Sequence, residues 1–256
     1  MPFTYSHIGF VLPIHKKWKA KLSISGLIFG SIAPDYDILF RLTNVRQHIF
    51  QYDLFSIFFV IFPLATVSAI CFHIFCRVIL IEQLPEAYTK RYARYKNVDF
   101  FVYLKTHYLA FSASCILAIF VHLFLDFFCH ILDAYNVRLF ISTFTNNSVL
   151  LNLSYLLAIY LLPILFSLYG FYLLYKYEGI RPQFFKSLRL SANAVKFWTF
   201  WLIVTLIIAA LKYQLSEMDV AFYFDFCIIT LTSAALIALY VVCMLKYILQ
   251  KWKTNQ

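Results

Sequence analysis

VHLFLDFFCHIL, residues 121–132, ends one of the long apolar runs of the chain and carries ionisable side chains at a fixed spacing. His122, Asp126 and His130 fall at i, i+4 and i+8, so a helix would align them in one stripe. The two histidines are then about 12 Å apart along the helix axis, too far to share one ion, whereas Asp126 can pair with either of them or bridge two ions. Each group is costly in apolar surroundings, which favours a functional site. The structural alternative is hydrogen bonding between packed helices.

The composition is that of an integral membrane protein. Of the 256 residues, 62% are hydrophobic and 13% are charged, and the mean hydropathy is +0.76, values that exclude an ordinary soluble domain. Four runs reach the roughly 20 residues that a spanning helix needs: residues 54–81, 108–131, 149–175 and 220–245. Two shorter runs, 22–40 and 195–211, are further candidates. The sequence therefore predicts an all-α, polytopic membrane helical bundle of about five to six spans.

Membrane topology explains the formal charge of +10 better than nucleic-acid binding does. The basic residues gather at the ends of the apolar runs: Lys16, Lys17, Lys19 and Lys21; Arg77, Lys90, Arg91, Arg94, Lys96 and Lys105; Lys176, Arg181, Lys186, Arg189 and Lys196; Lys246, Lys251 and Lys253. By the positive-inside rule these loops are cytoplasmic, and the loop 133–148 with the end of the His122 helix lies on the outer side. We expect a multi-pass protein of the cytoplasmic (inner) membrane, with both termini cytoplasmic or the N-terminus within a hairpin.

The cysteines indicate neither a disulfide framework nor a zinc knuckle. All six lie within apolar runs and none forms a C-x-x-C pair: Cys71, Cys76, Cys115, Cys129, Cys227 and Cys243. They are expected to pack as small buried hydrophobic residues. The N-terminus has no basic region ahead of its first apolar segment, so no cleavable secretory signal is expected.

The N-terminal segment predicts a helical hairpin. Residues 4–15 and 22–34 are apolar arms of about 18 to 20 Å, joined by a lysine-rich bend. In such a hairpin His7, in the first turn, would return beside Asp35 and Asp37. The hairpin would thus bring three further polar side chains together.

A proline separates the second arm from these acids. Pro34 disfavours the α conformation at Ala33, so we expect the helix to break or restart there. Asp35 and Asp37 would begin a new turn, where the positive helix-end potential favours carboxylates. They resemble ligands more than a solvated loop, with an ordinary interfacial loop as the alternative. His48 follows in a short outer connection and is a candidate ligand by position.

The remaining segments predict structure rather than chemistry. Pro63 and Pro163 are expected to kink their spans. The charged segment 82–105 is expected to form an amphipathic surface helix, and Asp225 is the only deep charge expected in the last two spans.

Several segments together resemble the bacterial membrane family known as domain of unknown function 4184. They are MPFTYSH (1–7), GSIAPDYD (30–37), His48, FFVIFPL (58–64), FHIFCRVIL (72–80), LPEAY (84–88) and HLFLDFFCH (122–130). The resemblance covers roughly residues 1–135. More distantly, the layout is similar to membrane-bound metal-dependent hydrolases, which share an early His, a P-D-x-D block, a later His and an H-x-x-x-D helix, and it weakly resembles the helical zinc-dependent phospholipase C fold.

The resemblance implies a metal site made from His7, Asp35, Asp37, His48, His122, Asp126 and His130, with Asp37 and Asp126 as candidate catalytic residues. Two departures from the hydrolase pattern stand out. The H-R-G-x-T-H-S stretch is reduced to Arg46-Gln47-His48, and the threonine of the last motif is replaced near Cys129-His130. Mixed His and Asp ligands suit a divalent metal, zinc above all.

The leading hypothesis is a membrane-embedded, metal-dependent hydrolase with a site open to the outer face. Its expected partners are membrane lipids and an amphiphilic, lipid-like or phosphoester substrate, without nucleic acid. The alternative is a non-enzymatic transporter, channel subunit or assembly partner with a structural or proton-carrying His/Asp network. Either way, residues 1–256 are expected to form a single integral membrane domain, with the metal site in 1–135 and additional membrane helices in 136–256.

Overall fold

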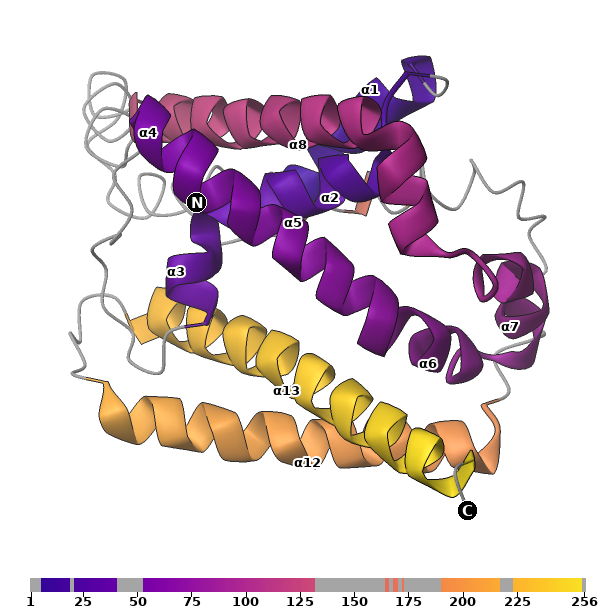
Figure 1. Cartoon of the computed structure of the whole chain (residues 1–256). Coiled ribbons are helices and arrows are strands. Elements are labelled where there is room, and N and C mark those ends of the chain that lie inside the picture. The colour runs from indigo at the N-terminus through magenta and orange to yellow at the C-terminus, as the bar shows by residue number, and fades with distance from the viewer. Residues whose placement is uncertain are drawn as a thin grey trace. The chain divides into compact units, whose positions relative to one another are not determined.

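The described part of the chain is helical throughout, as the sequence predicts. The computed structural model describes residues 6–18, 21–40, 53–131, 190–216 and 223–254, with a few positions between 164 and 172 (Figure 1). Two compact units can be distinguished. The first comprises Met1–Pro34, Phe50–Ala65 and Leu109–Gly179, and the second comprises Asp35–Ile49, Thr66–Tyr108 and Ile180–Gln256. The units alternate along the chain, so neither is a contiguous sequence domain, and the single-domain organisation stays a prediction.

Four helical segments in the described residues are long and apolar enough to cross a membrane. They are Leu54–Glu82, Phe100–Phe127, Ala192–Leu215 and Cys227–Thr254. They confirm the predicted runs 54–81, 108–131 and 220–245 and raise the shorter run 195–211 to a full span. These four candidate spans indicate a multi-pass membrane protein. Of the run 149–175, the structure describes only a few positions between 164 and 172.

The first span contains two turns of π-helix. In order it comprises α4 (Leu54–Ser56), a π-turn (Ile57–Ile61), α5 (Phe62–Cys71), a second π-turn (Phe72–Cys76) and α6 (Arg77–Glu82). Pro63 has no amide to donate to the preceding turn. The amide of Phe62 bonds the carbonyl of Ile57, five residues back, so the ladder shifts register just before the proline. The kink that the sequence predicts at Pro63 stays a prediction; what the structure shows is the π-turn directly before the proline.

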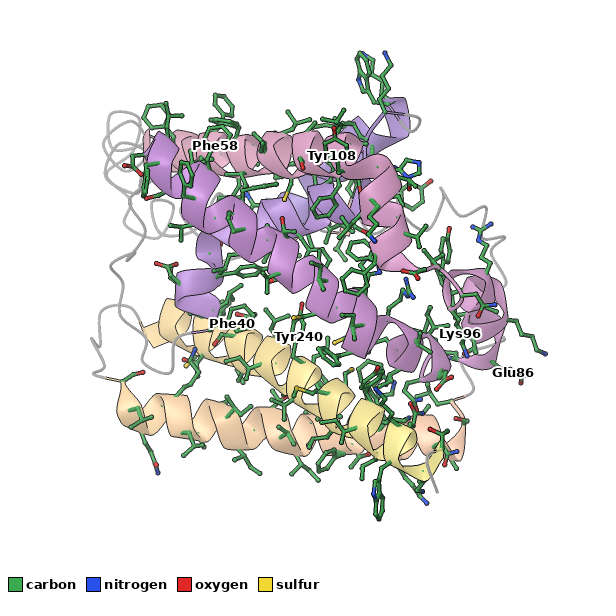
Figure 2. The ribbon with its side chains drawn as sticks, in the orientation of Figure 1. Phe40, Phe58, Glu86, Lys96, Tyr108 and Tyr240 are labelled. Atoms are coloured by element: carbon green, nitrogen blue, oxygen red, sulfur yellow. The ribbon has the colours of Figure 1, made fainter. Side chains whose placement is uncertain are left out.

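Large apolar side chains cover the outside of the long helices. Leu54, Phe59, Leu109 and Phe124 are 65 to 68% exposed. Figure 2 shows such side chains, with Phe58 among those labelled. Water would disfavour so much exposed apolar surface, whereas lipid does not, which agrees with a membrane environment.

In the first unit, the predicted N-terminal hairpin is present. It is formed by α1 (Ser6–Lys17) and α2 (Ile24–Ile32). Val11 of α1 and Leu27 of α2 pack with Ala118 of α8 (Phe100–Ile131) in one buried cluster. The hairpin is therefore anchored on the second half of α8.

Two glycines allow α2 to lie directly against the α8 backbone. A Cβ at Gly26 would lie 2.5 Å from the carbonyl oxygen of Phe111, and one at Gly30 would lie 2.3 Å from that of Cys115. This G-x-x-x-G spacing puts both glycines on one face, a common arrangement in membrane helix pairs. Ser114 completes the contact, since its hydroxyl accepts a 2.7 Å hydrogen bond from the Ser23 amide at the start of α2.

The predicted break or restart of the helix at Pro34 is present as a change of helix type, although Ala33 does not leave the α conformation. Ala33 stays in the right-handed helical region, at φ −58° and ψ −36°. Ala33–Asp35 form a 3₁₀ turn and Tyr36–Leu39 form the short helix α3. The tighter turn changes the hydrogen-bond register around the proline without leaving helical backbone angles.

In the second unit, α12 (Ala192–Leu215) and α13 (Tyr223–Thr254) form an antiparallel pair (Figure 1). The Trp201 indole donates to the carbonyl of Ala235, linking the two helices. Phe40, which follows α3, meets Tyr240 of α13 edge to face, with ring centroids 6.3 Å apart (Figure 2). The buried cluster of this unit is Cys76, Ile79, Phe197, Val242 and Cys243.

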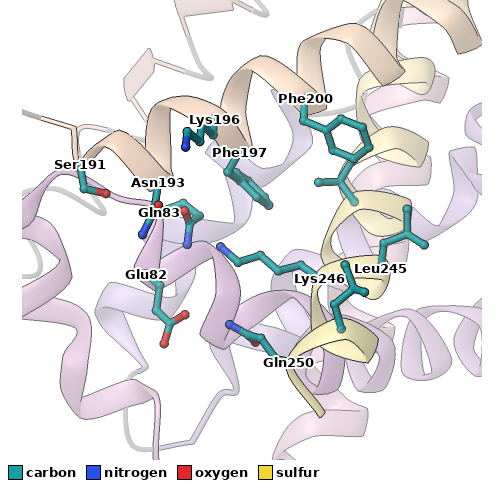
Figure 3. Close-up of a pocket in the computed structure, with 12 residues that line it drawn as sticks. Glu82, Gln83, Ser191, Asn193, Lys196, Phe197, Phe200, Leu245, Lys246 and Gln250 are labelled. Atoms are coloured by element: carbon teal, nitrogen blue, oxygen red, sulfur yellow. The ribbon is translucent and has the colours of Figure 1, made fainter. Parts of the chain in front are cut away.

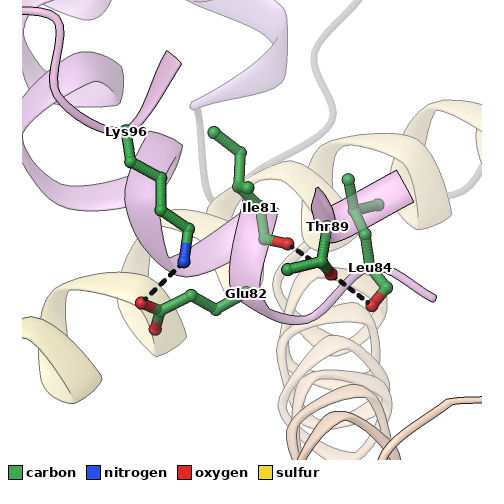
Figure 4. A network of polar contacts seen from close by, with 5 residues as sticks. All are labelled: Ile81, Glu82, Leu84, Thr89 and Lys96. Carbon is green, nitrogen blue, oxygen red and sulfur yellow. Dashed lines mark hydrogen bonds and ion pairs between the residues drawn. The ribbon is translucent and has the colours of Figure 1, made fainter. Parts of the chain in front are cut away.

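The segment 82–105 is only partly the surface helix that the sequence predicts. It contains α7 (Glu86–Tyr92) and a 3₁₀ turn (Ala93–Tyr95), and from Phe100 the chain already belongs to α8. Figure 4 shows polar contacts of this segment. The Thr89 hydroxyl of α7 lies 3.1 Å from the carbonyl oxygen of Ile81 and 2.9 Å from that of Leu84. Beyond the 3₁₀ turn, Lys96 pairs with Glu82 at 3.2 Å.

The cysteine prediction is confirmed for the described residues. Cys71, Cys76, Cys115, Cys227 and Cys243 all carry free thiols. Three of them are fully buried, at 76, 115 and 243. These cysteines pack as small apolar residues within the helices.

Candidate metal centre

Three of the predicted site residues meet in the first unit. His7, His122 and Asp126 each offer a ligand atom, and these atoms all lie within 4.8 Å of one another. The Nε2 atom of His122 is 3.2 Å from Oδ2 of Asp126, and that of His7 is 3.5 Å from Oδ1. Asp126 thus faces two imidazoles, one with each carboxylate oxygen: one ring comes from its own helix and the other from the hairpin.

The local structure explains these positions. His122 and Asp126 lie one turn apart on α8, as their four-residue spacing predicts. His7 lies in the first turn of α1, which is held on α8 through Val11, Leu27 and Ala118. Asp126 therefore pairs with His122, one of the possibilities that the sequence left open, and also with His7, which the helical spacing did not indicate.

A backbone carbonyl fixes the tautomer of His122. Its Nδ1 atom lies 2.6 Å from the carbonyl oxygen of Ser31, a contact between residues 91 positions apart. A carbonyl can only accept, so Nδ1 carries the proton and donates. This leaves Nε2 as the nitrogen that faces Asp126. In metal-binding histidines a backbone carbonyl often holds the other ring nitrogen in the same way and so orients the ring.

This tautomer creates a requirement at Asp126. With neutral His122, the Nε2 lone pair and a carboxylate oxygen face each other across 3.2 Å, and both are acceptors. Either a proton on Nε2 or a cation between the two groups turns this contact into an attractive one. The geometry therefore favours a proton or a metal ion between His122 Nε2 and the Asp126 carboxylate.

The stacking of the two imidazoles favours a metal over two protons. The rings of His7 and His122 are 3.9 Å apart at 28° between planes, and both side chains are fully buried. Two imidazolium charges at this distance would repel strongly in apolar surroundings, whereas a metal ion binds two neutral rings. Two neutral imidazoles and one carboxylate form a donor set that zinc accepts well.

The arrangement also leaves one side accessible. Asp126 is 14% exposed, whereas both histidines are completely enclosed. Tetrahedral zinc places its ligand atoms about 3.3 Å apart, close to the two separations at Asp126. Three protein ligands with an open fourth position are typical of catalytic rather than structural zinc sites.

The other predicted ligands are not part of this described group. Asp35 and Asp37 are buried, at 6% and 8% exposure, and belong to the second unit. Their approach to the three residues of the first unit stays a prediction. His48 and the side chain of His130 lie outside the described residues.

Two features of the structure were missed by sequence reasoning. The first is the Ser31 carbonyl, which no residue-type pattern marks; the glycines at 26 and 30 are the nearest signal, because they let α2 approach α8. The second is Lys212, a charge that sequence reasoning did not place inside the last two spans. It is fully buried in α12 and donates to the Ser233 hydroxyl at 2.6 Å.

Comparison with known families agrees with the sequence resemblance. The family model described as Domain of unknown function (DUF4184) matches residues 1–244. The chain belongs to this family. The DUF4184 match runs well beyond residue 135, to which the resemblance was traced, and it includes the hairpin, all three residues of the metal centre and α12. No curated protein and no solved structure matches the chain.

Proposed function

We propose that this DUF4184 chain is a membrane-embedded, metal-dependent hydrolase whose ion is bound by His7, His122 and Asp126. The observation that carries the proposal is the pair of contacts made by His122: its Nδ1 atom donates to the Ser31 carbonyl, so its unprotonated Nε2 atom faces the Asp126 carboxylate. Zinc is the expected ion, since the donor set is two imidazoles and one carboxylate.

The residues have distinct roles in this proposal. His7 and His122 supply neutral nitrogen ligands and exclude water from the enclosed side. Asp126 supplies an oxygen ligand on the accessible side. A divalent ion held there would polarise the scissile group and lower the pKa of a water molecule. Asp37 is proposed as the general base or as the group that assists the leaving oxygen, and Asp35 as a further ligand.

The proposed substrate is an amphiphile with a phosphoester or similar ester bond. Asp126 is close to the end of the span Phe100–Phe127, so its accessible side lies near headgroup depth when this helix crosses a bilayer. The basic loops argue for placing this end at the outer face of a bacterial inner membrane. The proposal keeps the five to six spans that the apolar runs predict, including the run 149–175.

A second candidate function follows from the same contact. A proton on His122 Nε2 would also relieve the His122–Asp126 contact, giving a buried ion pair in a non-enzymatic transporter, channel subunit or assembly partner. The two functions differ in what binds between these side chains, which makes metal content the deciding measurement.

Metal analysis of the detergent-purified protein tests the proposal. We expect about one zinc per chain, lost in His122→Ala and in Asp126→Ala. His107→Ala is the matched control, because His107 lies exposed on the same helix, outside the group. A parent protein without stoichiometric metal would eliminate the metal centre.

Two assays then separate the functions. In mixed micelles, the metal-loaded protein should hydrolyse a chromogenic phosphoester or lipid-like ester, and Asp126→Ala should abolish this activity. Alanine variants of Asp35, Asp37, His48 and His130 would show which further predicted residues contribute. Proton or ion flux in liposomes that depends on Asp126, as measured with Asp126→Asn, would support the non-enzymatic function instead.

A further inference from the structure

A second candidate binding site lies in the second unit, which contains none of the three residues of the candidate metal centre. It is an open pocket of about 550 Å³ lined by the end of α6, the first turns of α12 and the last turns of α13 (Figure 3). Glu82 is the last residue of one candidate span, and Ala192 and Thr254 are terminal residues of two others. Because it lies at span ends, the pocket is at the depth of lipid headgroups.

Two lysines give the pocket a positive wall. Lys196 extends from the first turns of α12, and Lys246 reaches into the pocket from α13 (Figure 3). The ammonium of Lys246 is 5.2 Å from the centre of the Phe197 ring, which lies on the same wall. Basic pockets between membrane helices at this depth suit anionic lipid headgroups.

A buried acceptor points to a ligand that also donates hydrogen bonds. Gln83 is 3% exposed, and its Oε1 atom has no hydrogen-bond partner within the described part of the chain. The residue is held in place, because its backbone carbonyl accepts a 3.0 Å bond from the Trp198 indole. A buried amide oxygen on a pocket wall is satisfied when a bound molecule supplies a hydroxyl or ammonium group.

Apolar side chains continue the pocket along the helices. Phe200, Leu245 and Leu249 line it and are 47 to 57% exposed. They offer an acyl chain a surface next to the lysines. A charged end, a hydrogen-bond acceptor and an apolar extension together match the three parts of a phospholipid.

We propose that this pocket binds an anionic phospholipid with a hydroxyl-bearing headgroup, of the phosphatidylglycerol type. Lys196 and Lys246 contact the phosphate, and the Gln83 amide accepts from a headgroup hydroxyl. The acyl chain lies along α12 and α13.

One acid on the pocket wall carries the charge opposite to that of the lysines, so its removal tests whether the bound headgroup is anionic. Glu82 also lines the pocket, and its carboxylate is 3.2 Å from the ammonium of Lys96 (Figure 4). This pairing offsets its charge only in part. Glu82→Gln should therefore strengthen lipid binding, a gain that a misfolded variant would not produce.

Native mass spectrometry of the full chain in detergent tests the proposal, with dioleoylphosphatidylglycerol, dioleoylphosphatidylcholine and inorganic phosphate as probes. Phosphatidylglycerol should bind more tightly than phosphatidylcholine. Each lysine substitution should weaken its binding about fivefold, and Lys196→Gln/Lys246→Gln about thirtyfold. Lys251→Gln/Lys253→Gln is the matched control, since these exposed α13 lysines do not line the pocket, and it should change binding at most about twofold.

Four results would overturn the proposal. Equal losses in the two double variants would mean attraction to general surface charge. Equal binding of the two lipids would rule out recognition of the anionic headgroup. Inorganic phosphate that displaces the lipid at equal concentration would identify a small-anion site. Weaker lipid binding by Glu82→Gln would contradict the proposal that the bound headgroup is anionic.

Discussion

Gly30→Ala tests whether the contact between α2 and α8 positions the metal centre. The added Cβ would lie 2.3 Å from the carbonyl oxygen of Cys115 and 2.8 Å from its Cα, and both are backbone atoms of a packed helix. Ordinary contact begins at 3.4 Å. The two helices would therefore have to separate by about 1 Å at this point.

The separation has two calculable effects. Overpacking costs about 1–3 kcal/mol, and the better helix propensity of alanine offsets about 1 kcal/mol, so stability should fall by up to about 2 kcal/mol. The hydrogen bond from His122 to the Ser31 carbonyl would stretch from 2.6 Å to beyond bonding range. Loss of such an orienting partner lowers metal affinity about 10- to 100-fold.

Thermal unfolding in detergent and zinc competition against a chromophoric chelator would measure both effects. Ser31→Ala is the control, because it keeps the backbone carbonyl, adds no atom, and removes only a hydroxyl that bonds the Ile28 carbonyl. It should retain the parent affinity. If Gly30→Ala instead raises the melting temperature, as helix propensity alone predicts, and binds zinc like the parent, the helix contact does not position the centre.

Two further predictions concern helix starts. Hydrogen bonds from the side chain and backbone amide of Ser56 hold the pKa of Asp53 below its usual value, so this cap is present above about pH 4 and is lost as the pH falls through the lowered pKa. The protection factor of the Ser56 amide, which is the exchange rate corrected for its intrinsic pH dependence, should fall on acidification in the parent but not in Asp53→Asn, which caps without titrating; an equal fall in both would refute this. Ser114→Ala should destabilise the protein by about 1–3 kcal/mol, because the buried Ser23 amide loses its acceptor, whereas Thr106→Ala, at an exposed hydroxyl of the same helix, should have little effect on the melting temperature.

Local properties of the sequence account for much of the fold. Hydropathy and run length predict the four described spans, because crossing a bilayer needs about 20 apolar residues whatever the neighbours are. The lysine-rich bend predicts the hairpin. Pro63, which has no amide hydrogen, predicts a kink, and the structure has a π-turn directly before it. The conformation at Ala33 could not be predicted this way, because a 3₁₀ turn and an extended residue both accommodate the following proline.

The candidate metal centre likewise has a part that could be predicted and a part that could not. The four-residue spacing predicts that His122 and Asp126 share a helix face, because four residues make about one turn. Only the tertiary structure decided that His7 is the second imidazole at Asp126 and that the Ser31 carbonyl sets the tautomer of His122. Both depend on how closely two helices cross, and that distance is set by packing between segments far apart in the chain, which no local pattern of residue types contains.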